Sequence, residues 1–470
     1  MQGGNIEVNS LLSWSRGSML GDGVTTVNGG IELSIANDPK TLNRRLENAN
    51  NGVATYQQGG TFGYWDIQAE GEFNNLAGST LEIAGGIQGA GAINNSGSIT
   101  GGGSITCRLN NAGVMDVGSL KLGNGTNESG ASINANTIDF GGTFEMAEDS
   151  NLTVNNIILS PYYGVTSIPW DMTIDSLTIN GSTLTGDGNI VINGPFVWVW
   201  GTMSGNGVTT VNGGMDLVQS NNAKTLNRRL ENANNGVATY QQGGTFGYWD
   251  IQAEGEFNNL AGSTLEIAGG IQGAGAINNS GSITGGGSIT CRLNNAGVMD
   301  VGSLKLGNGT NESGASINAN TIDFGGTFEM AEDSNLTVNN IILSPYYGVT
   351  SIPWDMTLDS LTIDGNILTG SGNIVVNGPL VWSAGTMSGD GKTTANGGIL
   401  ITGGGEKYLY RKLDNANNQV AVYGVEGQEV RYWRIYGEFN NLAGSELKSY
   451  YWLGDRGGWK VKQCRSCNRT

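Results

Sequence analysis

Residues 72–117 read EFNNLAGSTLEIAGGIQGAGAINNSGSITGGGSITCRLNNAGVMDV, and the fold can be argued from this stretch. An apolar residue followed by two asparagines opens it at Phe73 and recurs at Ile93 and Leu109, with spacings of 20 and then 16 residues. Glycine and small residues follow each opening, and then a short run in which apolar and polar residues alternate. Alternation of period two between turn residues predicts strands. No segment carries a sustained apolar stripe at helical spacing, so we expect little helix.

The chain also repeats on a longer scale. Residues 40–173 return letter for letter as residues 224–357, an offset of 184, and a partial third copy follows. Self-similarity at a fixed period is typical of stacked repeat proteins, in which a feature of every copy is more naturally a multivalent surface than one catalytic centre. We divide the chain into an entry segment (1–12), two repeat units (13–196 and 197–380), a partial third unit (381–445) and a divergent tail (446–470).

Two all-β architectures fit these strands: a string of antiparallel sandwiches, or a β-solenoid. Sandwich domains need strands of about five or six residues and about 100 residues per unit. The short runs and the recurrence at 16 to 20 residues favour the solenoid. In it, apolar residues point inward and asparagines stack as hydrogen-bonded ladders at the turns. We therefore predict an elongated parallel β-helix built from tandem 184-residue units.

Composition narrows the possible partners. The 470 residues include 79 glycines, and the formal net charge is −18. Nucleic-acid binding needs clustered Lys and Arg, so neither nucleic acid nor an anionic membrane surface is an expected partner. No stretch approaches the roughly 18 apolar residues of a membrane helix, so we expect no membrane insertion. The sequence leaves the oligomeric state open.

The turn sequences resemble those of a known class of repetitive proteins. GTMSGNG at 201–207, TTVNGG at 209–214, GEFNNLAGS at 255–263 and LNNAG at 293–297 are similar to segments of large bacterial surface and secreted proteins. The class includes filamentous haemagglutinins and autotransporter passengers. The resemblance implies a right-handed parallel β-helix, an extracellular or cell-surface location, and an adhesive role toward a glycan or a host or matrix surface. Residues 1–5 lack the features of a secretory signal, so we expect the export signal to lie upstream.

Repeated aromatic pairs are the strongest binding candidates. Adjacent strand residues face opposite sides, so one ring of each pair should face outward, where it could stack on a sugar. A repeated contact of this kind binds multivalently. The alternative is that both rings pack in the core. The pairs are Tyr64-Trp65, Tyr248-Trp249 and Tyr432-Trp433.

Basic residues recur near the aromatic pairs. Arg44, Arg228 and Arg411 each open a pair of basic residues, and they could bind carboxylated sugars. The alternative is that the basic pairs form ion pairs with the nearby acids Glu47, Glu231 and Asp414.

Catalysis has little support. The chain has no histidine, which excludes Ser-His-Asp and Cys-His mechanisms. A β-helix polysaccharide lyase or hydrolase, the alternative function, would need acidic groups on one face. In the third copy only Glu438 remains, and Arg434 stands at the aspartate position, so we expect no enzyme and no catalytic residues. A passive spacer that displays a domain outside this chain is a further alternative. The acidic candidates are Asp66, Glu70 and Glu72, repeated as Asp250, Glu254 and Glu256.

We expect no cofactor, with calcium as the alternative. The densest acidic clusters are Glu145, Glu148 and Asp149 and their repeats Glu329, Glu332 and Asp333. Solvated strand edges often carry such charges, and the Gly-Gly-x-Gly-x-Asp pattern of calcium-binding β-rolls is missing. Cys107 and Cys291 hold the same repeat position, and we expect both to be buried thiols. The basic tail 446–470 is either a cap or a shifted reading frame.

Overall fold

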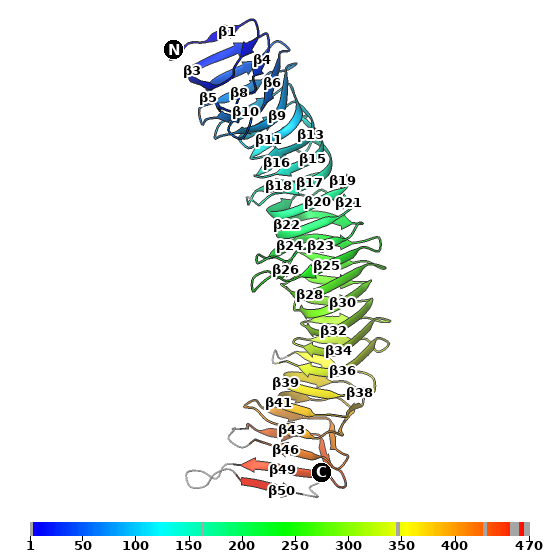
Figure 1. Cartoon of the computed structure of the whole chain (residues 1–470). Coiled ribbons are helices and arrows are strands. Elements are labelled where there is room, and N and C mark those ends of the chain that lie inside the picture. The colour runs from blue at the N-terminus through cyan, green and yellow to red at the C-terminus, as the bar shows by residue number, and fades with distance from the viewer. Residues whose placement is uncertain (1–2, 162, 345–347, 426–429, 452–459, 465–470) are drawn as a thin grey trace. The chain divides into compact units, whose positions relative to one another are not determined.

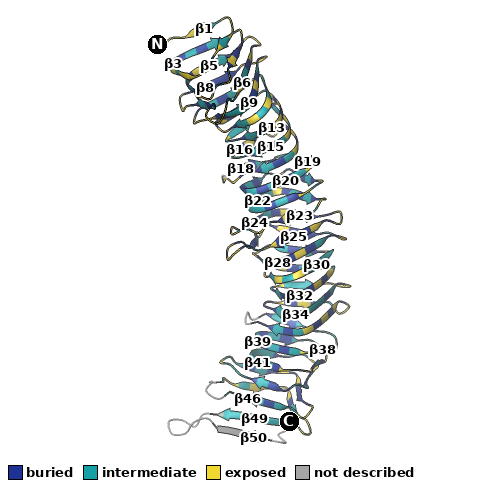
Figure 2. Ribbon diagram, viewed as in Figure 1, coloured by how far each residue is buried: buried dark blue, intermediate teal, exposed yellow. Residues whose placement is uncertain are grey.

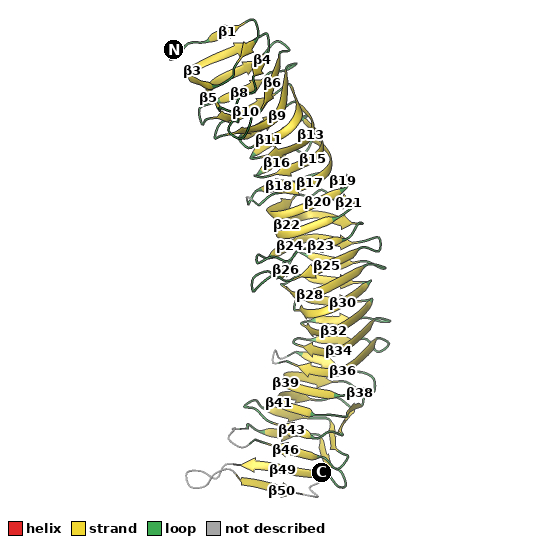
Figure 3. Ribbon diagram, viewed as in Figure 1, coloured by secondary structure: helices red, strands yellow, loops and turns green. Residues whose placement is uncertain are grey.

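The computed structural model describes residues 3–161, 163–344, 348–425, 430–451 and 460–464. The chain divides into two compact units, Met1–Glu231 and Asn232–Thr470. These units are not the sequence repeats, since the first contains one whole repeat and the opening of the next. The described residues form strands, turns and loops without a helix (Figure 3), which confirms the all-β prediction.

The strands up to the boundary between the units are β1 (Ile6–Val8), β2 (Leu12–Ser13), β3 (Gly17–Val27), β4 (Ile31–Leu33), β5 (Lys40–Asn48), β6 (Val53–Gln57), β7 (Trp65–Ile67), β8 (Glu72–Asn75), β9 (Thr80–Gln88), β10 (Ala92–Asn95), β11 (Ser98–Ile105), β12 (Arg108–Asn111), β13 (Val114–Leu122), β14 (Gly125–Asn127), β15 (Ser132–Phe140), β16 (Phe144–Met146), β17 (Asn151–Leu159), β18 (Val165–Ser167), β19 (Met172–Ile174), β20 (Ser176–Thr185), β21 (Ile190–Ile192), β22 (Phe196–Val211), β23 (Met215–Leu217) and β24 (Lys224–Asn232).

The strands that follow are β25 (Val237–Gln241), β26 (Trp249–Ile251), β27 (Glu256–Asn259), β28 (Thr264–Gln272), β29 (Ala276–Asn279), β30 (Ser282–Ile289), β31 (Arg292–Asn295), β32 (Val298–Leu306), β33 (Gly309–Asn311), β34 (Ser316–Phe324), β35 (Phe328–Met330), β36 (Asn335–Leu343), β37 (Val349–Ser351), β38 (Met356–Leu358), β39 (Ser360–Thr369), β40 (Ile374–Val376), β41 (Leu380–Met387), β42 (Lys392–Ala395), β43 (Ile399–Ile401), β44 (Lys407–Leu409), β45 (Lys412–Asn415), β46 (Val420–Tyr423), β47 (Trp433–Ile435), β48 (Glu438–Asn441), β49 (Glu446–Tyr451) and β50 (Lys460–Cys464).

Each unit is a parallel β-solenoid, and Figure 1 shows its strands stacked in coils. In the first unit a typical coil joins a short strand to a long one, as β10 is followed by β11. β8, β10 and β12 lie parallel, with Asn74 opposite Asn94 and Asn94 opposite Asn110. The 20- and 16-residue spacings of the sequence are therefore the lengths of successive coils. The same register recurs in the second unit for β27, β29 and β31.

Alternating side chains fill the inside of each coil, and Figure 2 shows buried and exposed positions alternating along the strands. Aligned positions form columns, such as Ile87, Ile105, Leu122, Phe140 and Leu159, all of them buried. Burying such side chains stabilises the fold by about 1.5–3 kcal/mol each.

A ladder of buried asparagines confirms the second part of the prediction. In the first unit the Nδ2 of each asparagine donates to the Oδ1 of the next, with distances of 3.0, 2.8, 2.7 and 2.7 Å. The first rung has no asparagine before it, because Val27 occupies that place. Accordingly, the buried Oδ1 of Asn48 has no hydrogen-bond partner. The ladder consists of Asn48, Asn75, Asn95, Asn111 and Asn127, and the second unit repeats it with Asn232, Asn259, Asn279, Asn295 and Asn311.

Glycine allows the long strands to bend between two faces of the coil. Gly101 has a φ of +93° and Gly103 a φ of +130°, and the register with β13 shifts between them. A Cβ on Gly101 would lie 2.1 Å from the carbonyl oxygen of Ile83 in the preceding coil. Asn50 and Asn51 also adopt a positive φ, as expected for asparagine at tight turns.

The two cysteines at the same repeat position are buried, as expected. Cys107 and Cys291 are buried free thiols, and burial raises the pKa of each to about 12.

In the tail, β50 pairs antiparallel with β49, whereas all the other strand pairings described within the units are parallel. Residues 452–459 and 465–470 of the tail lie outside the described residues. Among the described residues no helix is long and apolar enough to cross a membrane.

Candidate functional site

The tryptophan of each aromatic pair opens a three-residue strand. These strands are β7, β26 and β47. In the first two copies the tryptophan faces inward and is fully buried. The ring of Trp65 lies 5.8 Å from that of Tyr56 and 5.0 Å from that of Phe73, and Trp249 has equivalent neighbours. Trp65 and Trp249 are therefore core residues, which a sugar cannot reach in the folded protein.

The tyrosine is the outward member of each pair. Tyr64 and Tyr248 are half-buried, whereas Tyr432 is 68% exposed. Trp433 is only partly buried, and its ring lies 5.0 Å from that of Phe439. The period-two alternation of strands thus decides which ring of each pair can meet a ligand.

A second outward aromatic lies beside the first two pairs, and the sequence reasoning missed it. Phe62 is 63% exposed and Phe246 is 71% exposed, each two residues before the tyrosine. The signal was available, because Phe62 stands in the glycine-rich run 59–63 and recurs in the second copy. An apolar ring in a glycine-rich loop has few neighbours to bury it.

The first arginine of each basic pair is a core residue, which corrects the expectation that it binds a carboxylated sugar. Arg44, Arg228 and Arg411 are buried and donate to backbone carbonyl oxygens. The Arg228 Nη2 lies 3.0 Å from the oxygen of Gly188 and its Nη1 lies 3.2 Å from that of Ser204. Burial lowers the pKa of Arg228 and of Arg411 to about 10.

The repeated Gly-Asp/Asn-Gly turns make room for these arginines. A Cβ on Gly207 would lie 2.0 Å from the oxygen of Gly188 and 2.6 Å from the Arg228 Nη2. Gly23 and Gly391 stand in the same relation to Arg44 and Arg411. The second glycine of each turn is therefore required by the guanidinium packed beneath it.

The second basic residue of each pair faces outward and forms ion pairs. Two of the three acids expected as partners, Glu47 and Glu231, take part in them. Arg45 lies 3.6 Å from Glu47 and 3.5 Å from Glu72, and Arg229 lies 2.8 Å from Glu231. In the third copy Lys412 pairs with Glu438 at 3.5 Å, while Asp414 pairs instead with Lys392.

Lysines are buried four residues before the arginines. Lys40, Lys224 and Lys407 are fully buried, and burial lowers the pKa of Lys224 and of Lys407 to about 8. Lys224 Nζ donates to the oxygen of Val218 at 2.7 Å, and Lys407 Nζ donates to two loop carbonyls. The ammonium groups of Lys224 and Lys407 therefore hold the loop before the strand, whereas the buried Nζ of Lys40 has no hydrogen-bond partner.

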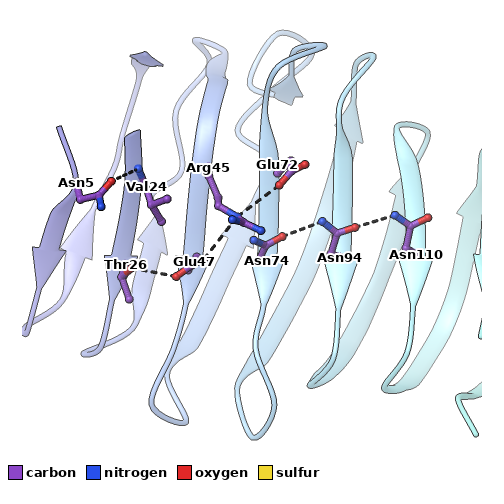
Figure 4. A network of polar contacts seen from close by, with 9 residues as sticks. All are labelled: Asn5, Val24, Thr26, Arg45, Glu47, Glu72, Asn74, Asn94 and Asn110. Carbon is purple, nitrogen blue, oxygen red and sulfur yellow. Dashed lines mark hydrogen bonds and ion pairs between the residues drawn. The ribbon is translucent and has the colours of Figure 1, made fainter. Parts of the chain in front are cut away.

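A column of polar side chains runs along the outside of the first unit (Figure 4). It consists of Thr26, Glu47, Asn74, Asn94 and Asn110, each aligned with the next. Thr26 donates to Glu47 at 3.0 Å, Asn94 donates to Asn74 at 2.8 Å, and Asn110 donates to Asn94 at 2.7 Å. Hydrogen bonds join Thr26 to Glu47 and, separately, the three asparagines to one another, so the column stabilises the stack of coils more readily than it offers free groups to a partner.

The column leads to a shallow groove of about 510 Å³ in the first unit. Arg108, Asn110, Thr126, Glu128 and Glu145 contribute to its wall. An equivalent groove of about 500 Å³ lies in the second unit, with Glu312 and Glu329 in its wall. Sequence reasoning identified Glu145 and Glu329 as calcium candidates but missed the arginine and the second glutamate.

The remaining calcium candidates lie in the turn that follows β16 and in the equivalent turn that follows β35. Asp149 accepts a hydrogen bond from Ser129 at 2.6 Å, as Asp333 does from Ser313. Glu148 and Glu332 are exposed. Within the described part of the chain, no group of three or more His, Cys, Asp or Glu side chains is placed to hold a metal ion.

Asp66 and Glu72, two of the acidic candidates for polysaccharide cleavage, are not placed as a glycosidase pair. Asp66 lies opposite Thr41 and Glu72 lies opposite Arg45, positions four residues apart on β5. Four residues of strand correspond to about 13 Å, beyond the roughly 5–9.5 Å between the carboxylates of glycosidases. Asp66 also accepts a hydrogen bond from Gln68, Glu72 pairs with Arg45, and Glu70 is exposed. The equivalent residues Asp250, Glu254 and Glu256 have the same sequence around them.

Comparison of the chain with protein-family models, with curated proteins and with solved structures gave no match. The fold and the site therefore rest on the residues and their geometry.

Proposed function

We propose that this chain is a non-enzymatic, adhesive part of a cell-surface or secreted protein, resembling filamentous haemagglutinins and autotransporter passengers. In this proposal the solenoid is a scaffold that presents aromatic side chains to a glycan. The observation that carries it is the recurrence of outward aromatic rings beside an inward tryptophan. Phe62 with Tyr64, Phe246 with Tyr248, and Tyr432 stand next to the same strand position of successive copies.

The chemistry of these positions supports a sugar ligand. Exposed tyrosine and phenylalanine rings pack against the apolar faces of pyranoses, and a tyrosine hydroxyl can also hydrogen-bond. Each contact alone is weak. Several contacts on one chain raise the avidity well above that of any single contact.

The test is binding of the whole chain to an array of glycans, compared with a variant lacking the outward rings. Phe62→Ala/Tyr64→Ala/Phe246→Ala/Tyr248→Ala/Tyr432→Ala should weaken the apparent affinity by about a hundredfold. Tyr163→Ala is a control, because Tyr163 is exposed and its ring contacts that of Trp200, which belongs to none of the pairs. Absence of glycan binding by the whole chain would contradict the proposal and favour a passive spacer.

A second candidate, a polysaccharide lyase or hydrolase, is supported by the groove that joins Arg108, Glu128 and Glu145. Two carboxylates and a guanidinium are the group types that such chemistry uses. Incubation with acidic and neutral polysaccharides tests it. New reducing ends or unsaturated products that disappear in Glu145→Gln/Glu329→Gln would support the enzyme over the adhesive scaffold.

A further inference from the structure

The third copy departs from the first at alternate outward positions of two neighbouring strands. In the first copy Thr41 lies opposite Asp66 on β5 and β7. In the third copy Tyr408 lies opposite Arg434 on β44 and β47. Two residues further on, immediately after the end of β44 and of β47, a tyrosine replaces a smaller polar residue. The replacements are Tyr408 for Thr41, Tyr410 for Asn43, Arg434 for Asp66 and Tyr436 for Gln68.

The introduced tyrosines form a stacked and exposed cluster. The rings of Tyr410 and Tyr436 lie 4.9 Å apart and within 7° of parallel, and the ring of Tyr408 lies 6.5 Å from that of Tyr410. Tyr410 is 51% exposed and Tyr436 is 60% exposed. Contiguous exposed rings of this kind mark interaction surfaces more often than isolated ones do.

An arginine fixes the edge of the cluster. The guanidinium carbon of Arg434 lies 6.0 Å from the ring centre of Tyr408 and 5.5 Å from that of Tyr432. Arg434 also pairs with Glu406 at 3.8 Å, and the hydroxyl of Tyr408 hydrogen-bonds to the same carboxylate. These contacts position Arg434 and Tyr408 before any ligand arrives, which lowers the ordering cost of binding.

A cavity of about 500 Å³ adjoins the cluster. Its wall includes Asp364, Thr386, Glu406, Tyr408 and Arg431. The volume lies within the range of small-molecule sites, about 300–1,000 Å³. Carboxylates accept hydrogen bonds from sugar hydroxyls, and guanidinium groups donate to them. The two carboxylates of the wall are balanced by Arg431 and the adjoining Arg434, so the charges do not select for an ionic ligand.

We propose that this surface of the third copy, formed by Tyr408, Tyr410, Tyr432, Arg434 and Tyr436 beside the cavity, is the principal glycan-binding site, and that its ligand is a neutral hexose oligosaccharide. The inference rests on the proposed function and names the ligand class and the copy that carries it. The sugar lies across the exposed tyrosine rings, and its hydroxyls reach the polar groups of the cavity.

The first copy supplies the matched variant. Tyr408→Thr/Tyr410→Asn/Tyr436→Gln restores the residues that the same strands tolerate in the first copy, and circular dichroism checks that the fold is kept. Binding of neutral hexose oligosaccharides, measured by calorimetry on the whole chain, should fall at least tenfold. The reverse exchange introduces the third-copy residues into the first copy of the triple variant, and it should restore part of the lost oligosaccharide affinity. Its substitutions are Thr41→Tyr/Asn43→Tyr/Asp66→Arg/Gln68→Tyr.

The outcomes separate this inference from the proposed function. If the whole chain binds a glycan and the folded triple variant binds it equally well, the third-copy site is wrong and the adhesive function stands. A preference for uronic-acid oligosaccharides over neutral ones would overturn the assigned ligand class. If the whole chain binds no glycan, the proposed function fails and this inference fails with it.

Discussion

Replacing Asn95 by alanine tests the buried asparagine ladder. Asn95 accepts a hydrogen bond from Asn75 at 2.8 Å and donates one to Asn111 at 2.7 Å. Asn95→Ala removes both, and Asn111 Oδ1 keeps only the 3.3 Å bond from the Gly113 amide. At about 0.5–1.5 kcal/mol for each of the two bonds between rungs, with a further 1–3 kcal/mol for a buried group left poorly paired, we expect a loss of about 2–6 kcal/mol.

Two controls belong to the same experiment. Asn94→Ala removes two bonds of similar length on the outer face, where water replaces them, so its cost should be smaller. Asn48→Ala breaks only one bond between rungs, because the Oδ1 of Asn48 has no partner in the folded protein, but it also removes the donor to the buried Oδ1 of Asn75. The expected order of destabilisation is therefore Asn95 first, Asn48 next because one buried oxygen loses its donor, and Asn94 last.

Native-state hydrogen exchange is the appropriate assay, because coils of a repeat protein open locally and a single unfolding transition is not assured. Residues 40–173 and 224–357 are identical, so their peptides coincide in the unmodified chain. Asn95→Ala gives the first-copy peptide its own mass, and the unchanged second copy becomes an internal reference. Equal exchange around Asn95→Ala and around Asn279 would refute the reasoning.

Two more predictions follow from the buried cations. Gly207→Ala should destabilise the protein by about 1–3 kcal/mol, because its Cβ would meet the Gly188 oxygen and the Arg228 guanidinium. Gly404→Ala, with nothing within 4 Å of the added Cβ, should be close to neutral, and native-state hydrogen exchange around each site compares the two variants. Burial lowers the pKa of Lys224 and of Lys407 from 10.5 to about 8, so the unfolded chain binds more protons between those values. The free energy of unfolding, relative to Lys224→Met/Lys407→Met, should therefore rise with pH from 8 to 10.5, and a flat or falling difference would contradict the assignment.

Much of the fold was predictable because its determinants are local. The Asn-Asn openings at 73–75, 93–95 and 109–111 set the coil length, and the register aligns them as the spacing implies. The direction of individual side chains was harder. Arg44 and Arg45 are neighbours, yet one lies in the core and the other at the surface. Strand alternation shows that the two side chains face opposite sides of the strand, but not which of them faces inward. The inward side depends on the register with the next coil.

The candidate site was less predictable than the fold, because it joins residues that are distant in sequence. Tyr410 and Tyr436 stack only because β44 and β47 are neighbouring rungs. Position-by-position comparison of the third copy with the first would have identified the changed outward residues. It would not have shown their contact with each other, nor the cavity beside them.

Hydroxyl-radical footprinting of the whole chain, with and without a bound neutral oligosaccharide, tests most directly whether outward tyrosines on this solenoid bind glycan. Without ligand, Tyr410, Tyr432 and Tyr436 should be labelled, whereas Trp65 and Trp249, which are fully buried, should not. Saturating sugar should protect the three tyrosines and leave Tyr163, which is exposed elsewhere, unchanged. Strong labelling of Trp65 or Trp249 in the folded protein, or a bound sugar that leaves the three tyrosines unprotected, would contradict the account.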